Sequence, residues 1–168
     1  GKTTDQFKSG EVAYLLSQGS TVTDGENTTY YSGASWGQQL GSDDYPVLSD
    51  YKVIKAAEGD NKTYWATFSN LNSNAELTAS TGEITVYNAT VSAGTLTLTK
   101  RSDNKVAMEE GVLLKANCEY VNAMNISDEV SAAATGENHL VATPATEQTI
   151  TADAGYTLYR LTYNNVSE

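Results

Sequence analysis

Two pairs of adjacent carboxylates, Asp43-Asp44 and Glu109-Glu110, are the side chains of this sequence that could take part in acid–base chemistry. A glycosidase needs two carboxyl groups about 5–10 Å apart in a cleft, one of them with a raised pKa. Each pair here flanks a turn-like stretch, where adjacent residues point into water. We therefore interpret both pairs as solvated turn residues. The sequence predicts no catalytic residue and a protein that is not an enzyme.

A nucleophilic or zinc site is difficult to assemble because the chain has one cysteine and one histidine. Cys118 follows an apolar run and is predicted to be a buried, inert thiol, since a free cysteine usually behaves as a small hydrophobic residue. A single cysteine also excludes an internal disulfide. His139 stands in no recognisable motif, so neither a catalytic triad nor zinc-ligand spacing can be formed. No metal and no cofactor are predicted.

Hard oxygen ligands of the kind that calcium prefers occur in two short stretches, Asp24-Gly25-Glu26-Asn27 and Asp103-Asn104. Neither stretch has the spacing of an EF-hand, whose bidentate glutamate would stand elsewhere. Turns in which an Asp or Asn side chain bonds its own backbone account for the same residues. Whether a structural calcium binds stays open.

Exposed aromatic rings offer a different chemistry, which is stacking on the face of a sugar. Tyr30 and Tyr31 lie in a stretch rich in Thr, Ser, Asn and Gly, and Tyr64-Trp65 lie in a predicted strand. Neighbouring residues of a strand face opposite sides, so one of these last two rings is expected to be buried and the other exposed. We take Tyr30, Tyr31 and Trp65 as candidate glycan-binding residues.

The elements that position these residues divide the chain into two predicted parts, residues 1–59 and 60–168. In the first, a helix is expected over residues 9–19, with Ser9 as its N-cap and Gly19 ending it in the left-handed conformation. Residues 20–35 are typical of a loop or a short hairpin, and residues 51–54 of a strand. The expected core of this part consists of Val12, Leu15, Leu16, Trp36, Tyr45 and Leu48.

The second part is predicted to be mainly β, a β-sandwich or partly open barrel of about seven strands. Leu96 and Leu98 alternate with threonines, so the leucines should share one face. The continuous apolar run 111–115 is typical of a strand that is covered on both faces. The expected strands are 63–68, 83–87, 95–99, 111–115, 119–124, 139–142 and 155–163.

The composition indicates which partners to exclude. The net charge is −11, with −4 in residues 1–59 and −7 in residues 60–168, so the acidic surface is spread along the chain. Such a surface repels nucleic acid and anionic membranes. No window approaches the roughly 18–20 apolar residues of a membrane helix, so no membrane insertion by this segment is expected. Eleven tyrosines against two phenylalanines suit the half-wet sheets of an extracytoplasmic β-protein.

Two patterns resemble a known group of proteins. The residues SGEVAYLL (9–16), WGQQLG (36–41) and DYPVL (44–48) are similar in order and spacing to a segment of large surface proteins of gut Bacteroidetes and some Firmicutes. Residues 64–68, 94–99, 111–115 and 156–159 resemble the β-domain that often closes such proteins. The resemblance implies an exported, adhesin-like protein at the extracellular or outer-membrane surface, and it supplies no catalytic residues.

We therefore expect a non-enzymatic cell-surface module with an adhesion, structural or interaction role in a larger bacterial envelope protein. Its partner would be another surface protein or a glycan, and the alternative is a carbohydrate-binding module that uses its exposed aromatic rings. The related β-domains usually continue into two further strands after the equivalent of residues 158–163. Because this chain ends at Glu168, we expect a sheet edge that is open to another strand.

Overall fold

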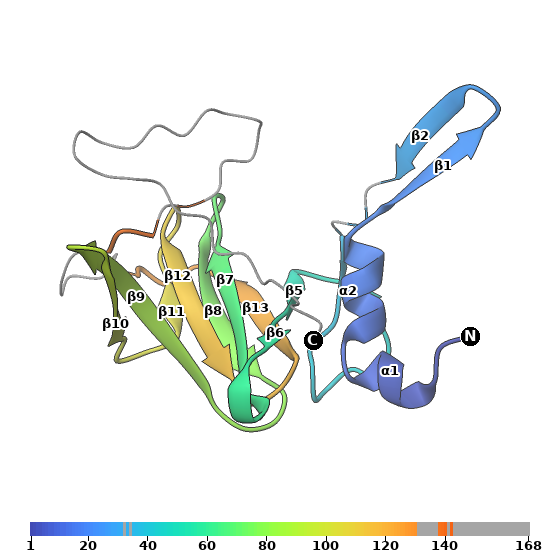
Figure 1. Ribbon diagram of the computed structural model, residues 1–168. Coiled ribbons are helices and arrows are strands. Elements are labelled where there is room, and N and C mark those ends of the chain that lie inside the picture. The colour runs from blue at the N-terminus through green and yellow to red at the C-terminus, as the bar shows by residue number, and fades with distance from the viewer. Residues whose placement is uncertain (32, 34, 131–137, 141, 143–168) are drawn as a thin grey trace.

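The fold is a β-sandwich with a small helical unit packed against one of its outer faces (Figure 1). The computed structural model describes residues 1–31, 33, 35–130, 138–140 and 142. One sheet has the order β10-β9-β12-β7-β6 and the other the order β11-β8-β13-β5, and every neighbouring pair is antiparallel. The predicted fold class is confirmed, as a sandwich and not a closed barrel.

The strands of the sandwich follow one another along the chain with short connections. A 3-10 helix, η1 (Asp60–Lys62), stands between the second and third strands. The strands are β5 (Tyr51–Lys55), β6 (Ala57–Glu58), β7 (Tyr64–Ser69), β8 (Asn74–Ala79), β9 (Ile84–Ser92), β10 (Thr95–Lys100), β11 (Lys105–Val106), β12 (Gly111–Ala116) and β13 (Tyr120–Ile126).

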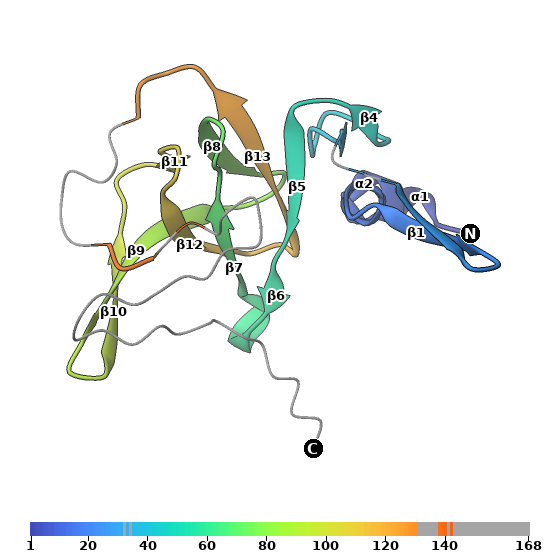
Figure 2. The same cartoon turned by 90° about the horizontal axis from the view of Figure 1, so that it is seen from above.

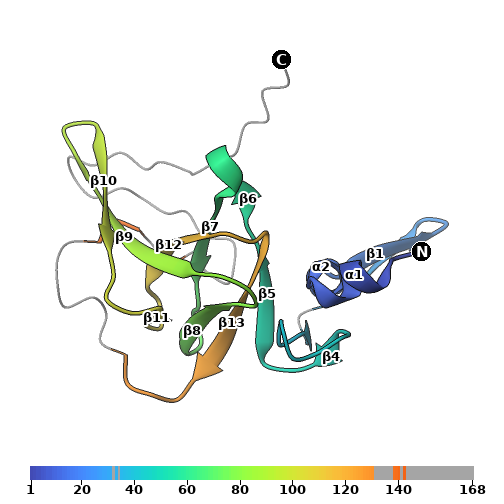
Figure 3. The ribbon, with the colours of Figure 1, turned by 90° about the horizontal axis from the view of Figure 1, so that it is seen from below.

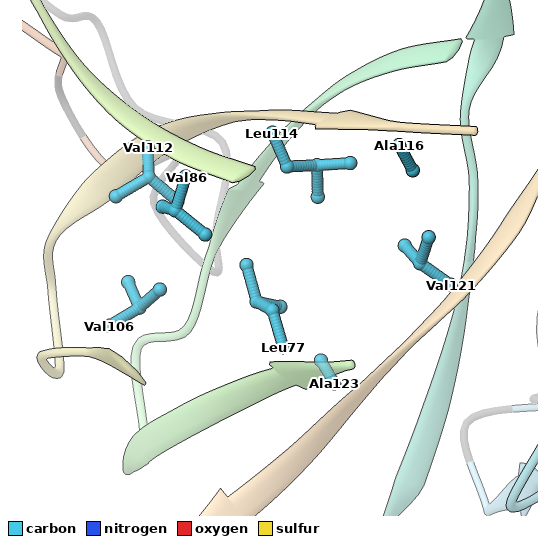
Figure 4. Packing of buried hydrophobic residues seen from close by; sticks show 8 residues of the cluster. All are labelled: Leu77, Val86, Val106, Val112, Leu114, Ala116, Val121 and Ala123. Carbon is cyan, nitrogen blue, oxygen red and sulfur yellow. The ribbon is translucent and has the colours of Figure 1, made fainter. Parts of the chain in front are cut away.

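The core lies between the two sheets, and its buried cluster is aliphatic. Alternation along each strand sends every second side chain inward, which is why Val121 and Ala123 of β13 face Leu114 of β12. Figure 4 shows these side chains converging from both sheets. The buried cluster consists of Leu77, Val86, Val106, Val112, Leu114, Ala116, Val121 and Ala123.

Most of the expected strands are present. Those predicted at 51–54, 63–68, 83–87, 95–99, 111–115 and 119–124 correspond to β5, β7, β9, β10, β12 and β13. The strand predicted at 139–142 is wrong for the residues described there. His139 and Leu140 have no strand structure, although the N–H of His139 donates to the carbonyl of Ala89 at 2.7 Å. The strand predicted at 155–163 lies outside the described residues.

Residues 1–48 form what we call the N-terminal unit, which lies beside β5 (Figures 2 and 3). Its elements are α1 (Thr4–Lys8), α2 (Glu11–Ser17), the hairpin β1 (Ser20–Asp24) and β2 (Asn27–Tyr31), and the short pair β3 (Trp36–Gly37) and β4 (Val47–Leu48). No helix among the described residues is long and apolar enough to cross a membrane.

The helix predicted over residues 9–19 is two helices. Thr3 caps α1 in a reciprocal arrangement with Gln6, and Ser9 ends α1 instead of starting the second helix. Gly10 adopts φ +91°, which breaks the helical path before α2. The prediction for Gly19 is confirmed, because its φ of +71° is left-handed and its N–H donates to the carbonyl of Leu16 at 3.1 Å.

The N-terminal unit is held to the outer face of β5 and β13 by a small mixed contact. Ala13, Leu40, Val53 and Tyr120 form a second buried cluster. Beside it, the buried Asn122 side chain accepts a bond from the N–H of Leu40 at 2.7 Å and donates to the carbonyls of Gln38 at 2.8 Å and Lys52 at 3.2 Å. One amide therefore bridges the unit and the sheet.

Candidate functional site

The core predicted for the N-terminal unit is wrong for most of its members. Leu15 is 47% exposed, Leu16 40%, Trp36 38% and Leu48 72%, and Tyr45 is exposed as well, whereas Val12 is buried as expected. The cause is geometric. Helix α2 has seven residues and buries only Val12 and Ala13, so its next turn extends beyond the sheet.

Some of these exposed side chains surround a shallow pocket of about 300 Å³. Leu15 and Leu16 come from α2, Tyr31 from the end of β2 and Trp36 from β3. Leu48 stands opposite Trp36 in the β3–β4 pair, so both side chains lie on the same side of that pair. We call the five residues Leu15, Leu16, Tyr31, Trp36 and Leu48 the apolar face.

A close backbone approach shapes this pocket. A Cβ atom on Gly33 would stand 1.7 Å from the carbonyl oxygen of Leu16, so only glycine lets the chain pass so near the end of α2. That passage brings the exit of the hairpin and Trp36 together with the helix. The remaining lining residues are Val12, Gly19 and Ser20.

The pocket lining is mainly apolar. Among its lining residues, the polar side-chain groups are the hydroxyls of Ser20 and Tyr31 and the indole N–H of Trp36, and no amide or charged side chain is present. Apolar surface gains free energy by leaving water, whereas a sugar needs hydrogen-bonding partners for its hydroxyl groups. The lining therefore suits a hydrophobic side chain better than a sugar.

The three candidate glycan-binding residues do not form one platform. Tyr31 lines the pocket, while the hydroxyl of Tyr30 donates to the carbonyl of Gln18 at 3.3 Å. Trp65 lies on the outer face of the five-stranded sheet, with its ring centroid 5.9 Å from that of Tyr87 and 5.4 Å from Nζ of Lys115. The structure thus places Tyr31 next to Trp36, and Trp65 elsewhere. The expectation of one buried and one exposed ring at Tyr64-Trp65 is wrong, since both are half-buried.

The carboxylate pairs do not lie in the pocket lining, and one member corrects the expectation of solvated turns. Glu110 is buried, and its Oε1 lies 2.7 Å from Nη1 of the equally buried Arg101. Its Oε2 accepts from the N–H of Ala107 at 3.1 Å. The other pair fits the expectation better, because Asp43 accepts from the N–H of Gln39 at 2.8 Å and Asp44 pairs with Lys8 at 3.1 Å.

In comparisons with protein-family models, curated proteins and solved structures, no match was found. The chain's own residues must therefore indicate its function.

Two neighbouring groups at the start of β13 have raised pKa values. Burial raises the pKa of Tyr120 to about 12, and nearby Glu119 adds to the effect. Burial also raises the pKa of the Cys118 thiol. This thiol is half-buried and not fully buried as predicted, and it donates to the carbonyl of Tyr120 at 3.3 Å.

Asp103 forms the expected Asx-type turn by accepting from the N–H of Lys105 at 3.2 Å. Within the described residues no group of three or more His, Cys, Asp and Glu could hold a metal ion.

Proposed function

We propose that this chain is a non-enzymatic interaction module of an exported bacterial surface protein, and that it binds a protein partner through the apolar face. The observation that carries the proposal is the exposure of Leu15, Leu16 and Trp36 around one mainly apolar pocket, with Leu48 exposed opposite Trp36 in the β3–β4 pair. Monomeric soluble proteins rarely leave a contiguous apolar patch uncovered unless it is a site of interaction.

The chemistry of the pocket supports a protein ligand. Hydrophobic pockets that take an aromatic or aliphatic anchor are the usual centres of protein interfaces, with a polar rim around them. The lining offers Leu, Val, Trp and Tyr side chains to such an anchor. The exported location is supported by the acidic, tyrosine-rich composition and by the resemblance of residues 9–16 and 36–48 to bacterial surface proteins.

A second candidate is a carbohydrate-binding module, favoured by the exposure of both Tyr30 and Tyr31, at 64% and 57%. Exposed aromatic rings on a hairpin can stack on a sugar face. This candidate has weaker support, because no amide or carboxylate lines the pocket with Tyr31.

A displayed library of bacterial extracellular domains, together with a glycan array, separates the two candidates. The probes are the full chain, the variant Leu16→Asp and the control Met108→Asp, which places the same charge on another exposed apolar residue, in the sandwich. We expect protein binders that retain affinity for the control and lose it for Leu16→Asp. Binding that is insensitive to Leu16→Asp would contradict the proposal. Glycan binding that is lost on Tyr31→Ala would favour the second candidate.

A further inference from the structure

The strand β10 forms an outer edge of the five-stranded sheet. It pairs with β9 on one side and with no other strand of the described residues on its second side. Its segment 95–99 reads Thr-Leu-Thr-Leu-Thr, without charge, proline or glycine, and Leu96 is 57% exposed. A regular exposed edge presents unpaired N–H and C=O groups to any other strand.

The other edges of the two sandwich sheets are protected in the ways that proteins commonly use. β6 and β11 have two residues each. β5 carries Lys52 and Lys55 and lies against α2 and β3 of the N-terminal unit. Short strands, lysines and a covering element all discourage edge pairing. Within the sandwich, the nearest rival to β10 is the part of β7 beyond β6. Outside it, β1 and β2 each have one edge without a partner strand among the described residues.

The turn between β9 and β10 determines which residues of β10 direct their backbone N–H and C=O groups away from β9. Ser92 and Thr95 are paired across a two-residue turn, which makes them a hydrogen-bonded pair. The N–H of Arg101 also donates to the carbonyl of Val86, at 2.8 Å, so the odd-numbered residues direct their backbone groups toward β9. The N–H and C=O groups of Leu96 and Leu98 therefore point outward from the edge.

The sequence of this edge is the same in both directions about Thr97. If a second copy approaches antiparallel with a two-fold axis at Thr97, Leu96 comes opposite Leu98 of the second copy. Both residues direct their backbone N–H and C=O groups outward, so they can form a hydrogen-bonded pair of an antiparallel ladder. In this register Lys100 comes opposite Gly94 of the second copy, and no like charges face each other.

We propose that β10 is a self-recognition edge, through which two copies of this chain pair as antiparallel strands about Thr97 and join their five-stranded sheets into one. The leucines of both copies then lie side by side on the outer face and the threonines on the inner face. The net charge of −11 opposes association, so salt strengthens it by screening. This inference is independent of the partner bound by the apolar face.

Disulfide trapping tests the register. The two-fold axis makes Thr97 and its counterpart a non-hydrogen-bonded pair, whose Cα atoms lie about 4.5 Å apart, within the range that a disulfide spans. In a Cys118→Ser background, we expect Thr97→Cys to form a disulfide-linked dimer under mild oxidation. The matched controls are Thr95→Cys and Thr99→Cys, which are exposed threonines of the same strand. Each lies roughly 13 Å from its own counterpart, so neither should form a disulfide.

Sedimentation equilibrium tests the association itself. The dimer fraction of the wild-type chain should rise with protein and salt concentration, and Thr97→Lys should weaken association roughly fivefold or more, because it sets two lysines opposite each other. A wild-type chain that stays monomeric at its solubility limit would overturn the proposal, as would trapping that is no greater than in the controls. A dimer that survives Thr97→Lys but is lost on Leu16→Asp or Thr67→Lys would also overturn it, because association would then belong to the apolar face or to β7.

Discussion

The sandwich and the N-terminal unit differ in how much of their large apolar side chains they bury. The sandwich buries Leu77, Leu114 and Val121 completely between its two sheets. The N-terminal unit buries the small Ala13 and leaves Leu16 and Trp36 exposed at its surface. Its attachment depends on four buried apolar side chains and one bridging amide. The difference separates residues that stabilise the fold from residues that remain available for a partner.

The largest expected effect tests this separation with the same substitution in both regions. Leu114→Ala should lower the free energy of unfolding by about 3–4 kcal/mol, because it leaves a cavity in a close-packed core. Leu16→Ala should change it by about 0.5 kcal/mol or less, because an exposed leucine loses little by truncation. Urea denaturation followed by circular dichroism measures both values. A loss of similar size at both positions would mean that the apolar face is part of the folding core.

The next effect concerns the bridge between the two regions. Asn122→Ala leaves the buried N–H of Leu40 and the carbonyl of Gln38 without their partner. Each such group costs about 1–3 kcal/mol, so we expect a loss of at least about 2 kcal/mol in the stability of the attachment. Amide hydrogen exchange should become faster at Leu40 and remain slow at Leu114.

Asn122→Asp is a second test of this bridge. It keeps the oxygen that accepts from Leu40, but it replaces the donor to Gln38 with a second oxygen and buries a carboxylate. It should therefore destabilise the attachment at least as much as Asn122→Ala. Faster exchange throughout both sheets in the Asn122→Ala variant would contradict the model of two separable regions.

The fold could be predicted from strand patterns where side chains are large and branched. The strict Thr–Leu alternation of β10 and the apolar run of β12 indicate their strands directly. β8 gives a weak signal because its inward residues are Ala75, Leu77 and Ala79, and alanine has low strand propensity. Its position is decided by pairing with β13, a long-range contact that the local sequence does not contain.

The candidate site could be predicted only in part. The polar surroundings of Tyr31 indicate a ring at the surface, but the sequence favours a core position for Leu15, Leu16 and Trp36, because large apolar residues are usually buried. The φ of +91° at Gly10 starts α2 late and fixes which face meets the sheet. The exposure of this face is indicated in the sequence by the shortage of large apolar residues on the other elements of the unit, since few of them could cover it.

A smaller effect depends on pH, at the contact between the two regions. The pKa of Tyr120 is about 12 in the folded chain, against 10.0 for an ordinary tyrosine. The folded state therefore holds this proton more strongly. The stability that results is complete below pH 10 and is lost as pH rises through 12. The stability lost between these pH values is about 2–3 kcal/mol. Tyr120→Phe has no phenol group to ionise, so its free energy of unfolding should not show this loss.

Urea denaturation of both chains between pH 9 and pH 12 measures the difference. Tyr14→Phe is the matched control, because its ring lies 6.1 Å from that of Tyr120 but is less buried. An alkaline loss that is the same in the wild type and in Tyr120→Phe would mean that the contact between the regions opens before the tyrosine ionises.

The smallest effect compares the turns of two hairpins, one in each region. Ala93 adopts φ +50° before Gly94 at φ +78° in the β9–β10 turn, where asparagine is preferred to alanine. Ala93→Asn should raise the free energy of unfolding by about 0.5–1 kcal/mol.

In the β1–β2 turn, Gly25 has φ +60°, and a Cβ atom added there would have no other atom within 4 Å. Gly25→Ala is strained to a similar degree, but the hairpin projects away from the sandwich (Figure 1). Its strain should therefore weaken the hairpin locally and leave the global unfolding midpoint unchanged. A midpoint that shifts equally for both turns would show that the hairpin folds as one cooperative unit with the sandwich.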